Sequence, residues 1–286
     1  MEIRFTKMHG NGNDFVLIDE MKGTVIPDDM KGGFAALYCD RRFGIGADGV
    51  LFISPSEKAD VRMRLFQQDE SEAEMCGNGI RCLAKYAFDA GLAAGTCTVE
   101  TRAGVMPVSM GYDGEGEFWA TIQMVDPAFA RSAIPATGEG EYKEEIDGFT
   151  VYAANTGVPH AVVFVDDVDD VDVQAAAPRI RHHPSFPKGA NVNFVQVTGE
   201  GGIRVRTFER GVEGETESCG TGATASAVVA HRLGRVGAEV HVETNGGPLV
   251  IGCGETTTMQ GPAVTVFSGV IERSEERRLG KECRSR

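Results

Sequence analysis

The sequence predicts an α+β protein of two similar, pseudo-symmetric domains, each a curved sheet packed around one central helix. Short strand-like runs dominate the chain, and each half contains a single prominent helical run. Both helical runs begin with a cysteine followed by Gly-x-Gly, at Cys76 and at Cys219. This repeated beginning, 143 positions apart, indicates that the two halves share one design.

The two central helices are predicted from the residues that follow each cysteine. Apolar residues recur there at helical spacing, and Gly91 and Gly234 end the two runs. Cys76 and Cys219 are therefore expected just before a first helical turn. The N–H groups and partial positive charge of that turn can hold a carboxylate and stabilise a thiolate. Cys82, inside the first helix, is expected to be an ordinary buried residue.

The remaining elements follow from alternation of apolar residues and from turn residues. Further helices are expected over 29–39 and 171–181. Strands are expected over 3–7, 15–19, 50–54, 61–66, 96–101, 104–110 and 118–124, and then over 149–153, 161–165, 190–197, 203–208, 240–243, 249–252 and 263–267. We expect a first domain over 1–126, to which 262–272 returns, a second domain over 127–261, and a linker within 126–145.

Composition narrows the functional class. The chain has 286 residues, 42% of them apolar, and no apolar run approaches a bilayer span, so a soluble protein is expected. Its first residues lack the apolar region of a signal peptide, which favours the cytoplasm. A formal charge of −14 argues against nucleic acid or an anionic membrane as partner. The seven cysteines form no C-x-x-C pair, so neither a disulfide framework nor a metal site is predicted.

The last fourteen residues, 273–286, depart from the rest of the chain. They contain six of the 28 basic residues and almost no apolar ones. They are either a disordered basic tail or a non-native segment, because they resemble the translation of a common sequencing adapter. We exclude them from the fold.

Two thiols at helix N-termini suit one type of reaction. Inverting a stereocentre by proton transfer needs a base on one face of the carbon and an acid on the other. If an approximate twofold axis relates the halves, Cys76 and Cys219 lie opposite each other across a cleft. A thiolate and a thiol can then exchange these roles when the reaction runs backwards.

Several motifs together resemble those of diaminopimelate epimerases. They are KMHGNGNDF at 7–15, EMCGNGIRC at 74–82, GVPH at 157–160, and ERG at 209–211 followed by CGTG at 219–222. The resemblance extends over about residues 3–270. It implies the fold of that family and a cofactor-independent enzyme that interconverts LL- and meso-2,6-diaminopimelate in lysine biosynthesis, commonly as a homodimer.

The resemblance also implies roles for individual residues. Cys76 and Cys219 match the acid/base pair, and His160 and Glu209 match residues near the thiols that help to set their protonation. The positions that match substrate-binding residues are Asn13, Gln67, Gly77, Asn78, Asn191, Glu209, Arg210, Gly220 and Thr221. The chain departs from the bacterial pattern of Gln, Asn and Asn at Gly49, Gln67 and Val158.

Other functions remain open at this point. A proline or hydroxyproline racemase would share single motifs, but its substrate has no distal amino-acid end for Arg210 and Asn191 to bind. An isomerase or dehydratase of the wider fold class would typically lack one thiol. A non-enzymatic redox or metal-binding protein would use the cysteines for pairing or ligation instead.

Overall fold

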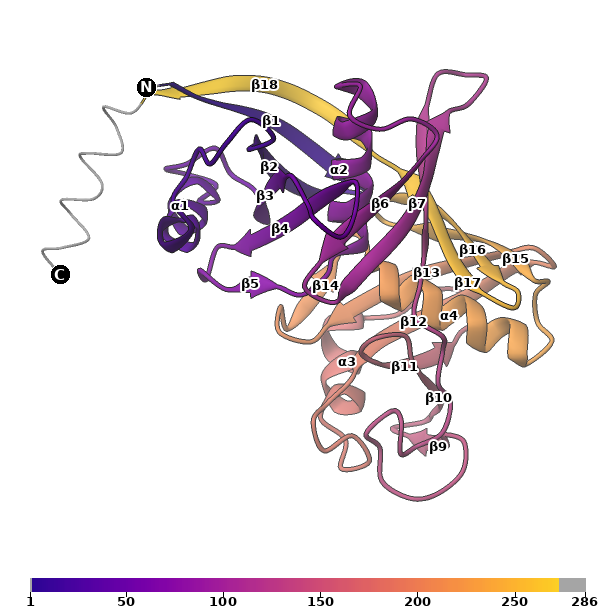
Figure 1. Cartoon of the computed structure of the whole chain (residues 1–286). Helices are drawn as coiled ribbons and strands as arrows, with labels where there is room; N and C mark the ends of the chain where they lie inside the picture. Colours follow the sequence, from indigo (N-terminus) through magenta and orange to yellow (C-terminus); the bar gives the residue numbers. More distant parts are fainter. Residues whose placement is uncertain (1, 273–286) are drawn as a thin grey trace, which may run out of the picture. The chain divides into compact units, whose positions relative to one another are not determined.

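The first and last described strands of the chain lie side by side in one sheet (Figure 1). In the computed structural model, which describes residues 2–272, β1 (Glu2–Gly10) pairs antiparallel with β18 (Val264–Glu272). The predicted tail, 273–286, lies outside the described residues. The chain divides into two compact units: unit 1 takes residues up to 120 and from 263 onward, and unit 2 takes residues 121–262.

Unit 1 is built on one mixed sheet with the strand order β18–β1–β2–β3–β4–β6–β7. The pairs β2/β3 and β4/β6 are parallel, and the other pairs are antiparallel. Its further strands are β2 (Asn13–Asp19), β3 (Gly49–Ser54), β4 (Val61–Gln67), β5 (Glu72–Ala73), β6 (Thr96–Thr101) and β7 (Gly104–Tyr112). Its helices are the short η1 (Asp28–Met30), α1 (Lys31–Tyr38) and α2 (Gly77–Asp89). The strand β8 (Phe118–Gln123) crosses the boundary between the units.

Unit 2 has the strand order β9–β10–β11–β12–β13–β15–β16–β17, with β11/β12 and β13/β15 parallel. Its strands are β9 (Lys143–Ile146), β10 (Phe149–Asn155), β11 (Pro159–Phe164), β12 (Asn191–Gly199), β13 (Gly202–Glu209), β14 (Gly214–Thr216), β15 (Glu239–Thr244), β16 (Gly247–Cys253) and β17 (Thr257–Pro262). Its helices are α3 (Val173–Arg181) and α4 (Gly220–Arg232).

The two units repeat one topology. The series from β1 through α2 to β7 matches the series from β10 through α4 to β16 in order and in strand sense. In each unit, the first α-helix connects two strands that pair in parallel. The second α-helix follows a short strand, β5 or β14, which pairs antiparallel with the strand before it. The predicted α+β class with two similar halves is confirmed.

Strand alternation assigns the two faces of each sheet to different helices. In unit 1, Val50 and Phe52 belong to the cluster that includes Phe34 of α1, whereas Leu51 points to Gly79 of α2. Successive strand residues face opposite sides, so this division follows from the period of two. The helices α2 and α4 lie against several strands of their own units, and most of their residues are buried.

The boundaries differ from expectation where elements are short. The expected linker over 126–145 is partly ordered, since Ala128 pairs with Asn155 and the strand β9 begins at Lys143. The two-residue β5 and three-residue β14 were not predicted, because so few residues carry no periodicity. Within residues 2–272, none of the helices combines the length and the apolarity that crossing a bilayer requires.

Candidate active site

Cys76 is the N-cap residue of α2. Its backbone is extended, with φ −146° and ψ 114°, while its carbonyl already accepts the first helical hydrogen bond from Ile80 at 2.9 Å. The N–H groups of the following residues, Gly77 and Asn78 among them, have no acceptor within the helix and face its N-terminal end. Unit 1 therefore presents a thiol beside a helical N-terminus, as the sequence predicts.

An oriented pair of amides lies beside the sulfur of Cys76. Asn13, at the start of β2, donates from Nδ2 to Oδ2 of Asp48 at 2.6 Å, which turns its Oδ1 the other way. That Oδ1 accepts from Nδ2 of Asn78 at 3.2 Å and from Sγ of Cys76 at 3.6 Å. The amide oxygen can only accept, so this contact favours the S–H form of Cys76.

Arg81 fixes the orientation of Asn78. It is completely buried, and its Nη2 donates to Oδ1 of Asn78 at 2.9 Å and to Oδ1 of Asn11 at 2.7 Å. Burial lowers the pKa of Arg81 to about 10, which leaves the guanidinium charged at neutral pH. This arginine was not among the predicted site residues, because its role depends on burial that a helical pattern does not show.

The remaining predicted residue of unit 1, Gln67, lies at the end of β4. Its side chain is exposed and accepts a hydrogen bond from Oγ of Ser71 at 3.2 Å on the turn to β5. The neighbouring strand explains the glycine at position 49. A Cβ on Gly49 would lie 2.7 Å from Cδ1 of Leu65 and 3.0 Å from the carbonyl oxygen of Phe66, so a larger residue here would require the Leu65 side chain and this backbone to shift.

Cys219 is the N-cap residue of α4, in the same local geometry. Its φ is −116° and its ψ 106°, and its carbonyl accepts from Ala223 at 2.8 Å. Gly220 and Thr221 form the first helical turn. Sγ of Cys219 lies 3.5 Å from Oγ1 of Thr221, and the carbonyl of Thr221 accepts from Oγ1 of the buried Thr156 at 2.9 Å. The start of the helix is thus fixed to the loop before β11.

His160 of β11 lies directly behind Thr221. Its Nε2 is 3.0 Å from Oγ1 of Thr221, and its Nδ1 is 3.1 Å from Nδ2 of Asn193. Burial is the main cause that lowers the pKa of His160 to about 3, and the positive charge of Arg210 acts in the same direction. The ring is therefore neutral at physiological pH, so it acts on its neighbours through hydrogen bonds and not through charge.

Asn191, Glu209 and Arg210 come together at the ends of neighbouring strands. Oδ1 of Asn191 accepts from the backbone N–H of Arg210 at 2.7 Å, and Oε2 of Glu209 accepts from Oγ1 of Thr216 at 3.1 Å. Nη1 of Arg210 contacts the carbonyls of Lys188 and Gly189 at 3.3 and 3.5 Å. These contacts give both the backbone and the side chain of Arg210 a defined position.

An ion pair between the buried Arg181 and the exposed Glu213 supports the turn that follows Glu209 and Arg210. Arg181 of α3 donates from Nη2 to Oε1 of Glu213 at 2.9 Å, and the same oxygen accepts from the N–H of Gly211 at 3.0 Å. Nη1 of Arg181 lies where a Cβ on Gly189 would be, only 1.4 Å away, so the guanidinium rests on that glycine. Neither Arg181 nor Glu213 was predicted, since nothing in the local sequence links α3 to this turn.

Strand register shows which residues of the two units correspond. Phe15 is opposite Gly49 and Leu17 is opposite Leu51 in unit 1, as His160 is opposite Asn191 and Val162 is opposite Asn193 in unit 2. Leu51 is in turn opposite Leu65, as Asn193 is opposite Thr207. The polar residues that support Thr221 and Cys219 in unit 2 thus have apolar counterparts in unit 1. Gly49 occupies the position of Asn191.

The other described cysteines have no sign of activation. Burial raises the pKa of the thiols of Cys39 and Cys82 to about 12, and that of Cys97 and Cys253 to about 11. Residues 2–272 also contain no group of three or more His, Cys, Asp or Glu side chains placed to bind a metal ion.

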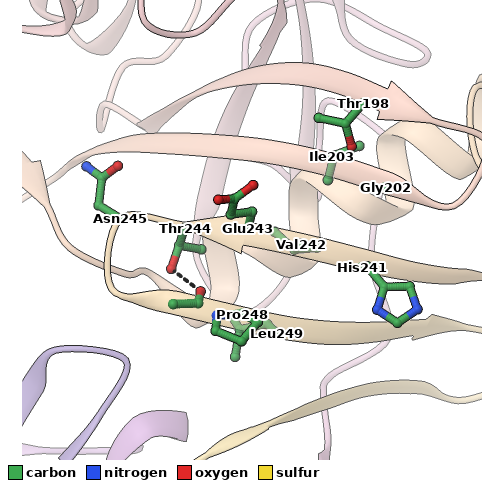
Figure 2. Close-up of a pocket in the computed structure, with 11 residues that line it drawn as sticks. Thr198, Gly202, Ile203, His241, Val242, Glu243, Thr244, Asn245, Pro248 and Leu249 are labelled. Carbon is green, nitrogen blue, oxygen red and sulfur yellow. Dashed lines mark hydrogen bonds between the residues drawn. The ribbon is translucent and has the colours of Figure 1, made fainter.

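A hollow of about 540 Å³ lies elsewhere in unit 2, along β13, β15 and β16 (Figure 2). Figure 2 shows Glu243 and Thr244 on β15 and Asn245 just beyond its end, with Oγ1 of Thr244 donating to the carbonyl of Gly247 at 2.7 Å. The residues that line it include none of the predicted site residues. The candidate site residues of each unit therefore lie around the start of its own central helix and not in this hollow.

Comparison with known families gives a consistent result. A family model described as diaminopimelate epimerase matches residues 5–128 and 152–266. A diaminopimelate epimerase of Methanothrix thermoacetophila is 57% identical over 272 residues, which cover 94% of this chain and 96% of that protein. One of Archaeoglobus fulgidus is 51% identical over 281 residues, with 97% and 99% covered.

Solved structures show the same fold at low sequence identity. A phenazine biosynthesis protein of the PhzF family from Bacillus anthracis matches with a TM-score of 0.72 at 18% identity, covering 95% of this chain and 99% of that one. A hydroxyproline epimerase from Agrobacterium vitis matches with a TM-score of 0.62 at 19% identity, covering 94% and 91%. At such identities the likeness concerns the fold alone.

Proposed function

The chain belongs to the diaminopimelate epimerase family, and from this we propose that it interconverts LL- and meso-2,6-diaminopimelate in lysine biosynthesis. It is an isomerase that inverts one α-carbon by proton transfer between the substrate and two cysteines, without pyridoxal phosphate. The observation that carries the proposal is the repeated local geometry, in which each unit presents one cysteine as the N-cap of its central helix.

The chemistry assigns complementary roles to Cys76 and Cys219. The thiolate of one removes the α-proton, and the thiol of the other delivers its own proton to the opposite face of the same carbon. After one turnover the thiolate has become a thiol and the thiol a thiolate, so the enzyme is ready for the reverse reaction. Inversion requires that the two sulfurs reach opposite faces of the α-carbon.

The helix N-termini supply the groups that would hold the α-carboxylate. The N–H groups of Gly77 and Asn78 in unit 1, and of Gly220 and Thr221 in unit 2, belong to first helical turns, which favour a negative charge. A carboxylate bound there would fix the α-carbon close to the thiols, and correct placement of reacting groups lowers the barrier substantially.

The distal end of diaminopimelate requires further contacts. We assign them to Asn13, Gln67, Asn191, Glu209 and Arg210, because Arg210 offers a planar fork for a carboxylate and the others offer amide or carboxylate groups for an ammonium. The held positions of Arg210 and Asn191 support this assignment. Gly49 and Val158 cannot contribute a side-chain hydrogen bond, so neither adds a contact to the distal end.

The alternative functions are not favoured. Relatives at 42–57% identity over more than nine-tenths of the chain are named diaminopimelate epimerase, whereas the hydroxyproline epimerase is similar only in fold. The same relatives argue against a redox or metal-binding protein, because their name describes an isomerase.

The proposal also includes a cytoplasmic homodimer. The strand β18 carries several exposed apolar side chains, Val264, Val266, Phe267 and Val270. An exposed apolar strip of this kind is typical of a protein interface, and a second copy of the chain is the partner that we propose. Equilibrium sedimentation of the purified chain and of a Val266→Glu variant tests it: a dimer that the variant weakens is expected, and a monomer would contradict it.

Direct conversion assays test the function. Purified protein without added cofactor should convert LL-diaminopimelate to a mixture of LL and meso forms, measured by chiral chromatography. L-Lysine, which lacks the distal carboxylate, and L-proline, which lacks the distal end altogether, should remain unconverted. Conversion of proline but not of diaminopimelate would contradict the substrate assignment.

A further inference from the structure

We propose that the hydroxyl group of Thr221 donates a hydrogen bond to the sulfur of Cys219 and holds this residue as the thiolate in the resting enzyme. Thr221 is then a positioning residue through its side chain, in addition to any contact of its backbone with substrate. The inference rests on the proposed role of Cys219 as one of the two acid/base thiols. It follows from the direction of a chain of hydrogen bonds that begins deep in unit 2.

The first step is the orientation of the Asn193 amide. Its Nδ2 lies 2.9 Å from the carbonyl oxygen of Ala161, and its Oδ1 accepts from Oγ1 of Thr207 at 3.0 Å. A backbone carbonyl can only accept, so Nδ2 and not Oδ1 must face Ala161. Asn193 is completely buried, and a Cβ on Gly222 would lie 2.4 Å from its Oδ1. The close approach of α4 to this amide therefore requires glycine at position 222.

The second step is the tautomer of His160. With Asn193 oriented in this way, its Nδ2 donates to Nδ1 of the imidazole at 3.1 Å, so Nδ1 must be the acceptor. A neutral ring has one donor and one acceptor nitrogen, and the proton is therefore on Nε2. The opposite tautomer would set two donors against each other at 3.1 Å. In the Nε2–H form, the ring also faces a second donor, Nδ2 of Asn191, but at the longer distance of 3.4 Å. This Nδ2 can donate instead to the carbonyl oxygen of Pro159 at 3.3 Å.

The third step is the hydroxyl of Thr221. Because Nε2–H of His160 donates to Oγ1 at 3.0 Å, the single proton of the hydroxyl is free to point elsewhere, and Sγ of Cys219 lies 3.5 Å from the same oxygen. A donor directed at sulfur stabilises the thiolate relative to the thiol. Burial lowers the pKa of His160 to about 3, so the ring stays neutral and has a single donor nitrogen.

Unit 1 lacks the corresponding chain. The positions that match Thr207, Asn193 and His160 are Leu65, Leu51 and Phe15, all buried and apolar. Position 78, which matches Thr221, is an asparagine whose Nδ2 is directed to Asn13, and the sulfur of Cys76 faces the acceptor Oδ1 of Asn13. Hydrogen bonding thus favours a thiol at Cys76 and a thiolate at Cys219, although the two helices begin alike.

Other ionisable groups near α4 are few, and most have their own partners. The strand β11 brings His160, and the end of β13 brings Glu209 and Arg210; the side chain of Glu209 accepts from Thr216. Further along β13, Arg204 pairs with Asp169, and Arg206 pairs with Glu215.

Four other strands pack against α4, and β12 among them carries no ionisable side chain. The ionisable side chains on the other three are Tyr152 on β10, the exposed Glu239, His241 and Glu243 on β15, and Cys253 on β16. The hydroxyl of Thr221 makes a direct contact with Sγ of Cys219.

Alkylation of individual thiols tests the proposal without relying on turnover. Wild type, Thr221→Val and Thr221→Ser are treated with iodoacetamide across a series of pH values, and modification of each cysteine is followed by peptide mass spectrometry. Valine keeps the shape and removes the hydroxyl, whereas serine retains it. We expect Thr221→Val to raise the midpoint for Cys219 by about one pH unit. The serine variant should keep the wild-type midpoint, and the midpoint for Cys76 should stay constant in all three proteins.

An unchanged Cys219 midpoint in Thr221→Val would overturn the proposal. A second measurement stands independently of that variant: ¹⁵N NMR of histidine-labelled protein, with His160→Gln to assign the signal, should show a neutral Nε2–H ring from pH 5 to 9. A ring protonated on Nδ1 would overturn the proposal as well. Neither result depends on the acid/base role of Cys219, which fails separately if Cys219→Ala retains epimerisation.

Discussion

Nε2 of His160 lies 3.0 Å from Oγ1 of Thr221, which connects a neutral, buried histidine to the helical turn that bears Cys219. The contact joins two elements that are far apart in the sequence, the strand β11 and the helix α4. It gives the histidine of the GVPH motif a role as a hydrogen-bond donor to the turn that bears the thiol. Burial lowers the pKa of His160 to about 3, so the ring acts without a positive charge at neutral pH.

Loss of either site cysteine should abolish epimerisation. Cys76→Ala and Cys219→Ala each remove the only group that serves one face of the α-carbon, so turnover should fall by at least the 10²–10⁴-fold, in round terms, that a general acid or base contributes. Cys253→Ala is the control, because this thiol on β16 has its pKa raised to about 11 by burial and should be dispensable. Turnover near the wild-type rate in either site variant would rule out the two-thiol mechanism.

The buried His160 should make stability depend on pH. Histidine in an unfolded chain titrates near pH 6.5, roughly, whereas folding lowers the pKa of His160 to about 3. Between these values the unfolded state binds the extra proton, so the contribution of His160 to the free energy of unfolding rises with pH and is lost as pH falls. His160→Gln should remove this dependence.

Chemical denaturation of wild type and His160→Gln between pH 4 and 7 measures the effect. As the pH decreases, the free energy of unfolding of the wild type should fall relative to that of His160→Gln. His182→Gln provides the control, since its side chain is 62% exposed. A difference that stays constant over this range would mean that His160 is protonated in the folded state as readily as in the unfolded one.

The glycines of the two helix starts should respond unequally to alanine. In Gly222→Ala the new Cβ would lie 2.4 Å from Oδ1 of Asn193, a buried amide held by other bonds, so Asn193 or the helix must move. In Gly79→Ala the nearest atom is Cδ2 of Leu51 at 3.2 Å, the end of a flexible side chain.

Overpacking of this kind costs about 1–3 kcal/mol. We expect Gly222→Ala to fall in this range, with a marked loss of kcat, and Gly79→Ala to be the milder of the two. Denaturation midpoints and steady-state kinetics on both variants decide the matter. Equal losses would show that Asn193 is not as rigidly placed as its hydrogen bonds indicate.

The ion pair behind the Glu209–Arg210 turn should affect substrate binding more than chemistry. Arg181→Gln removes the guanidinium that bonds Glu213 and rests on Gly189, and the carbonyl of Gly189 is one of the acceptors of Arg210. We expect KM for diaminopimelate to rise several-fold and the melting temperature to fall.

Arg179→Gln is the matched control for Arg181→Gln. It lies on the same helix and removes the pair with Asp147, in which the arginine side chain is 65% exposed, and exposed pairs contribute at most about 1 kcal/mol. If both variants raised KM equally, the effect would come from the charge of α3 and not from support of the turn.

Patterns confined to one segment were predictable from sequence. The spacing of apolar residues places the starts of α2 and α4 at the two cysteines, and the 143-residue offset between these cysteines predicts that the two halves share one topology. Residues whose importance depends on pairing across the sheet were not predictable. Asn193 and Thr207 look like ordinary polar strand residues until the register places them opposite each other and behind His160.

The difference between the surroundings of Cys76 and Cys219 was not predictable either, because it also depends on pairing across the sheet. The motifs CGNG and CGTG look equivalent, and only the three-dimensional correspondence of Phe15 with His160 and of Leu51 with Asn193 shows that the two thiols have different supports. The burial of Arg81 was not predictable either. From the sequence alone it is an ordinary polar residue of a helix, whereas in the structure it is completely buried.

The central claim, one proton transferred by each of two thiols, is tested most directly by following the α-hydrogen in D₂O. Wild-type enzyme is presented with LL-diaminopimelate, and isotope content is measured by NMR and mass spectrometry in early product and in recovered substrate. Two separate thiols predict a meso product that carries solvent deuterium at the inverted carbon, while the remaining LL substrate still carries hydrogen. Product that retains the substrate hydrogen, or deuterium entering the LL substrate without inversion, would indicate a single base and contradict the claim.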